Sequence, residues 1–276
     1  GTSLKIGLIG CGAIGSTLAR QIDAGKVGEV KLVCVYDLKP ESCERLVRKL
    51  KSKPKIAREI SEIYKDKAID LVVEAASQAA VRQYSLNVVN SDKGLMIISV
   101  GALADDSLLK KLQAEAKRKG QRIYIPSGAV VGMDGVKSSS LVGIKEVTLT
   151  TRKPPAAFHG SEYLQKRKID LTGLKHSQVI FDGTAREAVK SFPASVNVAA
   201  TLSLAGVGFG RTRVRIIADP SLTVNVHEIK VKGKAGELVA ESRNVPFPDV
   251  PRTSYLAALS VVRTLKNLSE TIRVGT

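Results

Sequence analysis

The sequence has no tryptophan and few aromatic residues of any kind. Aromatics make up 4% of its 276 residues, which leaves little side-chain material for stacking nucleic acid bases. The net charge is +17, but the basic residues are scattered and follow no zinc-finger or helix-turn-helix pattern. We therefore expect no nucleic acid partner and no metal site. The basic excess is interpreted as a solvated surface that also attracts anionic small molecules.

Long apolar runs and paired cysteines are also missing. No apolar stretch reaches the roughly 20 residues of a membrane helix, and no leader with an apolar signal region precedes the first predicted strand. The three cysteines, Cys11, Cys34 and Cys43, are interpreted as reduced thiols. We expect a cytoplasmic protein without membrane contact. The chain is long enough for two modest domains with a buried core.

Residues 5–15 carry the most informative pattern. A short apolar strand leads into Gly10, Gly12 and Gly15, spaced as Gly-x-Gly-x-x-Gly, and a helix-like segment follows. The first glycine permits a tight turn, the second lets a pyrophosphate approach the backbone, and the third lets the helix pack against the strand. The helix N-terminus then faces the phosphates. The predicted cofactor-binding residues of this loop are Gly10, Gly12, Ala13, Ile14 and Gly15.

A second apolar strand, at residues 30–36, supports a dinucleotide. It ends in Asp37, about 20 residues past the glycines, where a carboxylate accepts both ribose hydroxyls of an adenosine. A carboxylate there repels a 2′-phosphate, which favours NAD. Lys39 softens that repulsion, so NADP stays open as a second cofactor. Ser77 and Gly101 follow later strands, at positions where Rossmann-type folds contact the cofactor.

The first half of the chain alternates between strand and helix patterns. Apolar strands separated by helices are typical of a parallel sheet that is covered on both faces. The last of these helices has Asp105 and Asp106 at its start and Gly120 just past its end. We predict an α/β protein whose residues 1–130 form a Rossmann-type, doubly wound parallel sheet. Further strands are expected at 71–73, 96–100 and 122–125, and helices at 41–51, 79–89 and 107–119.

The second half has a different rhythm, with several strand-like runs and two helices. Thr184 and Glu187 form a capping-box pattern at the start of the first helix, and the second begins near Val196 or Asn197. We predict a C-terminal α+β domain with a mixed sheet over residues 131–250. The strands are expected at 146–151, 179–181, 214–218, 224–231 and 238–242, and residues 251–276 are expected to form a helix that packs back on the first domain.

One of the three histidines differs from the others. His159 and His176 lie in loop-like segments, as surface histidines usually do. His227 shares one face of its predicted strand with Ile229, whereas Val226 has the opposite parity. This change of parity predicts a bulge or twist near His227, and bulges often turn a side chain toward an active site. A hydrogen-bonded core histidine is the alternative to a role in proton transfer.

An ordered set of motifs in the second half resembles that of one family, the archaeal and bacterial L-aspartate dehydrogenases. The resemblance covers almost the whole chain. The motifs are Pro126-Ser127-Gly128-Ala129 with Gly132 and Asp134, Arg152-Lys153-Pro154-Pro155, the run from Phe181 to Ala188, Pro193 with the run from Asn197 to Leu202, Ala218-Asp219-Pro220, and Asn225-Val226-His227.

The resemblance implies an NAD(P)-dependent oxidation of L-aspartate to iminoaspartate. This product feeds NAD biosynthesis or breaks down to oxaloacetate and ammonia. The resemblance also places Ala129 and Asn197 at the nicotinamide cofactor and His227 in the active site, and it implies a homodimer formed through the second sheet. Asn197 would in addition suit the N-cap of its helix.

Aspartate carries two carboxylates, so cationic or hydroxyl groups should line its binding cleft. Lys153, Thr253 and Ser254 are the candidates for the substrate site. The sequence does not choose between these and the arginines at 186, 215 and 252, which also suit surface or capping roles.

Two other functions stay open at this point. One is a different oxidoreductase of similar architecture, either dihydrodipicolinate-reductase-like or homoserine-dehydrogenase-like, although the second-half motifs are not typical of either. The other is a non-catalytic NAD(P)-sensing protein, which would not need His227 and Asn197 as a pair. Activity with L-aspartate would distinguish these alternatives.

Overall fold

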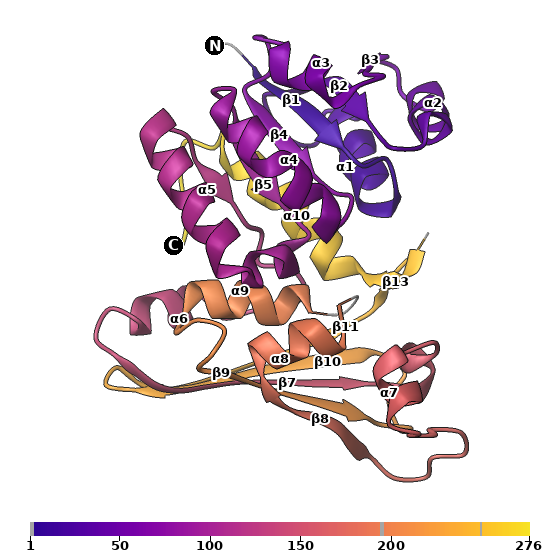
Figure 1. Cartoon of the computed structure of the whole chain (residues 1–276), viewed down its shortest axis with the longest axis vertical. Coiled ribbons are helices and arrows are strands. Elements are labelled where there is room, and N and C mark those ends of the chain that lie inside the picture. The colour runs from indigo at the N-terminus through magenta and orange to yellow at the C-terminus, as the bar shows by residue number, and fades with distance from the viewer. Residues whose placement is uncertain (1–2, 194–195, 249) are drawn as a thin grey trace. The chain divides into compact units, whose positions relative to one another are not determined.

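The structure is a computed structural model that describes residues 3–193, 196–248 and 250–276. The chain divides into two units, each with its own main sheet (Figure 1). The first unit contains residues 1–126 and 258–274, and the second contains residues 127–257 and 275–276. No helix in the described ranges has the length and apolar character that crossing a membrane requires.

The first unit is built on a parallel sheet in the strand order β3-β2-β1-β4-β5-β6. The chain builds outward from β1 in one direction and then from β4 in the other, so the topological switch point lies between β1 and β4. Ligands of such sheets bind at the carboxyl ends of the strands beside this point. The strands are β1 (Leu4–Ile9), β2 (Val30–Tyr36), β3 (Lys55–Ile56), β4 (Leu71–Glu74), β5 (Gly94–Ile97) and β6 (Ile123–Tyr124).

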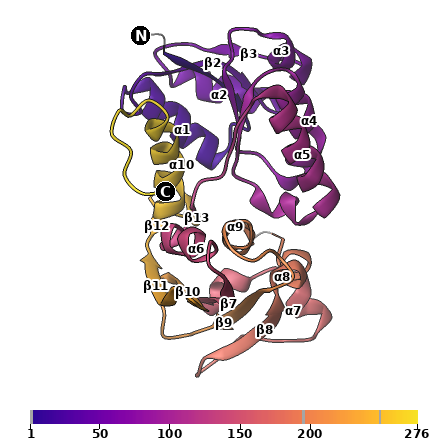
Figure 2. The ribbon, with the colours of Figure 1, turned by 90° about the vertical axis from the view of Figure 1, so that its left-hand side faces the viewer.

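Helices cover both faces of this sheet. Figure 2 shows α1 and α10 on one face and α4 and α5 on the other. Leu18 of α1 and Leu265 of α10 belong to the same buried cluster as Leu8 of β1, so the C-terminal helix contributes to the core of the first unit. The helices are α1 (Ala13–Asp23), α2 (Pro40–Arg48), α3 (Ile60–Lys65), α4 (Gln78–Asn90), the 3₁₀ helix η1 (Val100–Ala104), α5 (Asp106–Lys119) and α10 (Tyr255–Asn267).

The second unit has a mixed sheet in the order β11-β10-β7-β9-β8. The β7–β9 pair is parallel, and the other three pairs are antiparallel. Figure 1 shows α6, α8 and α9 on the same face of this sheet. Its elements are α6 (Met133–Ser139), β7 (Ile144–Lys153), η2 (Pro155–Phe158), α7 (Glu162–Lys166), β8 (Gln178–Thr184), α8 (Ala185–Ser191), α9 (Asn197–Ala205), β9 (Thr212–Ala218), β10 (Asn225–Gly233), β11 (Gly236–Asn244) and the pair β12 (Pro246–Phe247) and β13 (Val250–Ser254).

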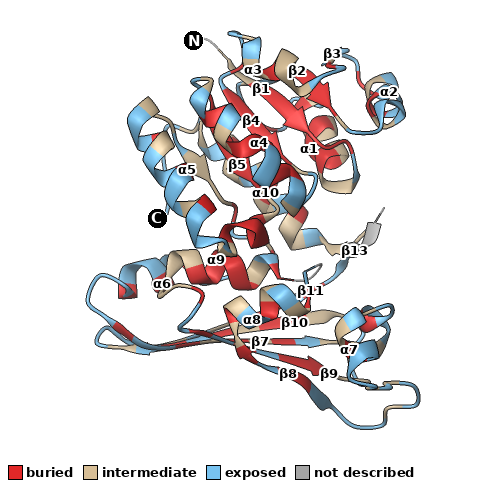
Figure 3. Ribbon diagram, in the orientation of Figure 1, coloured by how far each residue is buried: buried red, intermediate tan, exposed pale blue. Residues whose placement is uncertain are grey.

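Burial differs between the two sheets. In the first unit, β4 and β5 are buried at every residue, as expected for strands covered on both faces (Figure 3). In the second unit, buried Val147, Leu149 and Thr151 of β7 alternate with more exposed neighbours. The α/β class with a parallel first sheet and a mixed second sheet is therefore confirmed.

Local end signals in the sequence are confirmed at three helix ends. The Asp105 side chain accepts a hydrogen bond from the N–H of Leu108, and Gly120 adopts the left-handed conformation past the end of α5. At the start of α8, Thr184 and Glu187 form the reciprocal capping box.

The strand expected at residues 96–100 is shorter than the apolar run suggests. β5 ends at Ile97, and Val100 already belongs to η1. The N–H of Ser99 donates to the carboxylate of Glu74 at 2.9 Å instead of extending the ladder. The short elements β3, α3, α6, α7, β12 and β13 were not expected from the sequence, because each is too short to show a clear hydrophobic period.

Thr184→Ala should lower the free energy of unfolding by about 1 kcal/mol, because the Glu187 N–H at the start of α8 loses its acceptor. Urea unfolding measures the change. Thr184→Ser keeps the hydroxyl and should retain most of the stability. An alanine variant as stable as the wild type would contradict the capping role.

Candidate active site

Glycine is required for a different reason at each of the three positions in the loop after β1. Gly10 has φ of +101°, and a Cβ there would lie 2.5 Å from the carbonyl oxygen of Ala75. A Cβ on Gly15 would collide with the carbonyl of Gly10, so α1 can approach the loop this closely only with glycine. A Cβ on Gly12 would meet nothing within 4 Å. Gly10 and Gly15 shape the loop, whereas the space at Gly12 is left open for a ligand.

Asp37 stands beside this loop at the carboxyl end of β2. Its two oxygens accept the N–H groups of Cys11 and Lys39 at 2.8 and 2.9 Å. These bonds fix the carboxylate, and each oxygen keeps a lone pair for a further donor. A cavity of about 310 Å³ is lined by Gly10, Gly12, Asp37 and Ser77 together with other residues of the first unit. A pyrophosphate and a ribose diol both fit the chemistry of this edge.

The remaining sequence candidates of the first unit take different places. Ala13 and Ile14 form the first turn of α1, which contains no acidic side chain. Ser77 caps α4 by accepting the N–H of Ala80 at 3.1 Å. Gly15 and Gly101 are buried, so their contribution comes through packing.

The cysteine inside the loop is a buried thiol. Cys11 Sγ lies 3.5 Å from Cys43 Sγ. This hydrogen bond and burial raise the pKa of Cys11 well above its usual range. Such a thiol is a poor nucleophile.

In the second unit, His227 lies on β10 with 6% of its surface exposed. Its Nδ1 is 2.9 Å from Thr151 Oγ1 on the neighbouring strand β7. Of the bulge or twist expected near His227, the bulge is wrong, because β10 pairs without interruption from Val226 to Lys232. Val226 lies on the sheet face opposite His227 and is nevertheless buried. On that face it is paired with Arg152 of β7, which is in turn paired with Ile217 of β9. The apolar residue at position 226 is therefore explained by long neighbouring side chains that cover it, and not by a bulge.

Burial, reinforced by the charge of Lys153, lowers the pKa of His227 to about 4. The imidazole is therefore neutral near pH 7 and can accept a proton. Lys153 lies two residues after Thr151 on β7, hence on the same face of the sheet. Burial also lowers the pKa of Lys153, and no described residue gives its ammonium a hydrogen bond or an ion pair. An unpaired cation beside a neutral imidazole suits an anionic substrate that must lose a proton.

Ala129 is held by the same sheet. Its carbonyl accepts Ser242 Oγ at 2.9 Å and Asn244 Nδ2 at 2.7 Å, and all three residues are buried. Ser242 is the register partner of His227, so one strand pair supports both. Sequence reasoning missed Thr151, Ser242 and Asn244. The sequence pattern that could have revealed them is a polar residue at a position where the alternation of the strand predicts a buried apolar one.

Asn197 is the first residue of α9, and its side chain is exposed. The N-cap is Val196, so the expected capping role of Asn197 is wrong. The side chain thus lies at the first turn of a helix whose N–H groups point the same way.

The other substrate candidates are spread through the second unit. Thr253 and Ser254 end β13, and Ser254 Oγ accepts the N–H of Ala257 at 3.1 Å as a helix cap. Arg215 lies on the sheet face opposite His227 and pairs with Asp182 at 3.7 Å. Arg186 lies over the ring of Phe209, and the side chain of Arg252 is outside the described part of the chain.

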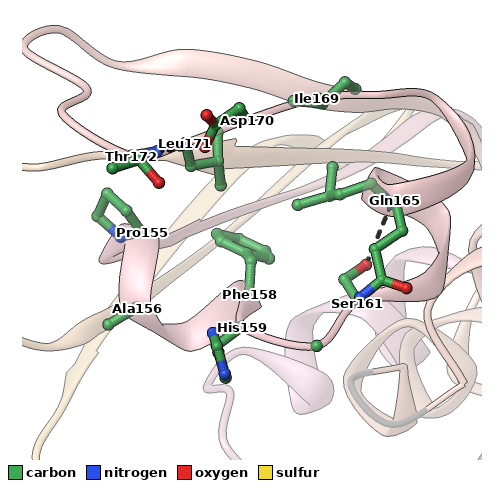
Figure 4. A pocket seen from close by; sticks show the side chains of 12 residues that line it. Pro155, Ala156, Phe158, His159, Ser161, Gln165, Ile169, Asp170, Leu171 and Thr172 are labelled. Carbon is green, nitrogen blue, oxygen red and sulfur yellow. Dashed lines mark hydrogen bonds between the residues drawn. The ribbon is translucent and has the colours of Figure 1, made fainter.

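His159 and His176 are exposed, as the sequence indicates. A cavity of about 330 Å³ lies at the segment 155–172, around buried Phe158 (Figure 4). His159 lines it, but its ring points away from Leu171 and Thr172 across the ribbon. None of the predicted cofactor or substrate residues lines this cavity. Within the described ranges, no three His, Cys, Asp or Glu side chains are grouped as metal ligands.

Two family profiles match successive parts of the chain. The profile described as "Aspartate dehydrogenase, C-terminal" matches residues 134–268. The profile described as "Homoserine dehydrogenase, NAD binding domain" matches residues 10–126.

Curated relatives that match along their full length are named L-aspartate dehydrogenase. L-aspartate dehydrogenase of Methanococcoides burtonii is 49% identical over 99% of this chain and 100% of its own length, and that of Methanosarcina acetivorans is 48% identical with the same coverage. Among solved structures, aspartate dehydrogenase from Thermotoga maritima superposes with a TM-score of 0.76 at 30% identity, covering 99% of both chains.

Stability should fall with acid because of His227. Its pKa is about 4 in the folded protein and 6.5 when exposed, so the unfolded chain binds more protons between these values. Lowering the pH from 7 to 5 should therefore remove about 1–2 kcal/mol that His227→Asn, which cannot be protonated, does not lose.

Urea unfolding of both proteins at the two pH values measures this difference. Exposed His176 provides the control, since His176→Asn should keep the wild-type pH dependence. Equal pH dependence in wild type and His227→Asn would show that the imidazole is not held neutral by burial.

Proposed function

The chain belongs to the L-aspartate dehydrogenase family, and we propose that it oxidises L-aspartate to iminoaspartate with NAD as the electron acceptor. Hydrolysis of the imine then gives oxaloacetate and ammonia, or the imine feeds NAD biosynthesis. The observation that carries the proposal is a buried neutral imidazole, His227, on the same sheet face as Lys153, whose ammonium has no partner among the described residues.

Residues of the first unit supply the cofactor site. Gly12 leaves room for the pyrophosphate beside the first turn of α1, and Asp37 has free lone pairs for the adenosine ribose. Gly10 and Gly15 keep the loop in shape, Ala13 and Ile14 offer backbone N–H groups, and Ser77 and Gly101 complete the strand-end edge. In the second unit we assign Ala129 and Asn197 to the nicotinamide end. When bound, the nicotinamide takes up a hydride.

His227 is assigned the proton transfer. The α-ammonium of aspartate must lose one proton before Cα can release a hydride, and a neutral imidazole accepts it. Thr151 Oγ1 occupies Nδ1, so the other ring nitrogen, Nε2, is the one left for the substrate. After the hydride has left Cα, the product is an iminium, to which water adds.

Lys153 is assigned to a substrate carboxylate. A partly buried ammonium that has lost hydration and has no partner among the described residues is costly, and an anion restores the pairing. Thr253 and Ser254 are proposed as hydroxyl donors for the second carboxylate. Their place directly before α10 puts them at the start of a helix, where N–H groups also favour anions.

We further propose a cytoplasmic homodimer that uses the open face of the second sheet. Among the described helices, Figure 1 shows none on the face opposite α6, α8 and α9. Val239 and Val179 are exposed at the two edge strands of this face. Such a surface can pair with its own copy about a two-fold axis. Three buried free cysteines fit a reducing compartment.

The first unit alone does not separate this function from that of a homoserine-dehydrogenase-like enzyme, since its profile carries that description. The second unit does, because its profile is that of aspartate dehydrogenases and it contains His227 and Lys153. An NAD(P)-sensing protein would not need that pair.

Purified protein should reduce NAD with L-aspartate, and His227→Asn should lower kcat by at least about 10²-fold. Asparagine can keep a polar contact with Thr151 but has no equivalent of Nε2. NADH absorbance measures turnover, and NADH binding should change little. His159→Ala and His176→Ala are the controls and should stay near the wild type.

A His227→Asn protein that is destabilised yet turns over normally would refute the proton-transfer role. Wild-type protein that binds NADH but does not oxidise L-aspartate would refute the substrate.

Asp37→Ala should lower the preference for NAD over NADP, because the carboxylate that binds the ribose diol and repels a 2′-phosphate is gone. We expect a change of about 10-fold or more in the ratio of kcat/KM values, the size of a lost charged hydrogen bond. Asp23→Ala is a matched control, since Asp23 also accepts two backbone N–H groups, from Lys51 and Ser52, but is the last residue of α1, at the end far from the glycine loop. An unchanged ratio in Asp37→Ala would disprove the assignment.

A further inference from the structure

A second carboxylate at the switch point is not used by the function proposed above. Glu74 is the last residue of β4 and only 2% exposed. A buried carboxylate is costly unless donors satisfy it.

The carboxylate of Glu74 accepts five hydrogen bonds from described residues, and these five come from two loops. The N–H groups of Ala76 and Ser77, after β4, donate to Oε2 at 2.8 and 3.0 Å. The N–H groups of Ile98 and Ser99, after β5, donate to Oε1 at 3.1 and 2.9 Å. Ser99 Oγ also donates to Oε2 at 2.8 Å. One side chain therefore ties the two loops together.

Both loops belong to the edge where a dinucleotide binds. β4 and β5 are parallel neighbours, so their carboxyl ends meet. Ser77 lines the cavity that contains Gly12 and Asp37, and η1 with Gly101 starts directly after Ser99. The loop after β4 thus serves the adenosine half of the site, and the loop after β5 extends the same edge.

We propose that Glu74 is a positioning residue for the cofactor, which fixes the two loops at the spacing that one dinucleotide spans. The proposal rests on the proposed function only through its dinucleotide. The hydrogen bond to Glu74 also defines the chemistry of Ser99. Its hydroxyl donates its proton to Glu74, so its half-buried oxygen can meet a ligand only as a hydrogen-bond acceptor. It suits a ribose hydroxyl and would repel a phosphate.

Two substitutions test whether the shape, the charge and the length of the Glu74 side chain are each required. Glu74→Gln keeps the shape, but its NH₂ group faces N–H donors in place of one oxygen. Glu74→Asp keeps the charge but is one methylene too short to serve both loops. Unmet buried donors cost about 1–3 kcal/mol, so we expect either variant to weaken NADH binding about 10-fold or more.

NADH fluorescence titration and the KM for NAD measure this loss, while kcat at saturating NAD should stay within about threefold because no reacting atom is touched. Adenosine monophosphate, which reaches one half of the site, should lose less affinity than NADH. Ser99→Ala removes one of the five contacts and should give a smaller loss in the same direction, which tests the proposal should Glu74→Gln not fold.

Lys93→Met is the matched control. Lys93 is charged, 2% exposed and in the same unit, but it precedes β5 and donates to the carbonyl of Asp66 at 2.6 Å, away from the carboxyl ends of the strands. It should lower the melting temperature without changing NADH affinity.

Wild-type NADH affinity in Glu74→Gln would overturn the proposal, and so would an equal loss in Lys93→Met at the same drop in melting temperature. Equal losses of NADH and adenosine monophosphate would also overturn it, since only one loop would then depend on Glu74. Wild-type protein that binds NADH without oxidising L-aspartate would refute the proposed function and leave this result standing.

Discussion

The parallel pairing of β1 with β4 is the constraint on which the first unit depends. It places the turn at Gly10 against Ala75, so tightly that no side chain fits, and the N–H of Ala75 donates to Ile9 at 2.8 Å. The two strands sit at the topological switch point, where their following loops diverge and leave an open edge. The glycine loop, Asp37 and the loops held by Glu74 all meet there because of this pairing.

In the second unit, the corresponding constraint is the inward face of the mixed sheet. Thr151, His227 and Ser242 occupy facing positions on three adjacent strands, β7, β10 and β11, so they form one polar row inside an apolar layer. Burial keeps the imidazole of His227 neutral, and the Ser242 hydroxyl donates a hydrogen bond to the carbonyl of Ala129. The sheet register thus decides both the protonation state of His227 and the position of the loop that begins the unit.

Several features were predictable because they depend on neighbours in the chain. The strand at 30–36, the capping box at Thr184 and the end of α5 at Gly120 all agree with the sequence. Two of the errors come from tertiary contacts. The strand before Val100 stops because Glu74 takes its N–H groups, and Val226 is covered on the face opposite His227. The third error is a shift of one residue, since Val196 rather than Asn197 takes the N-cap position of α9.

The sequence by itself determined the fold class, the glycine loop, the carboxylate after β2 and the family motifs, because periodicity, backbone freedom at glycine and capping are local properties. Only the tertiary structure decided which polar groups are buried together. Thr151 and His227 are 76 residues apart, and Ser242 and Ala129 are 113 apart, so no local pattern could pair them. Strand register brings such residues into contact, and burial then sets their hydrogen bonds and charge.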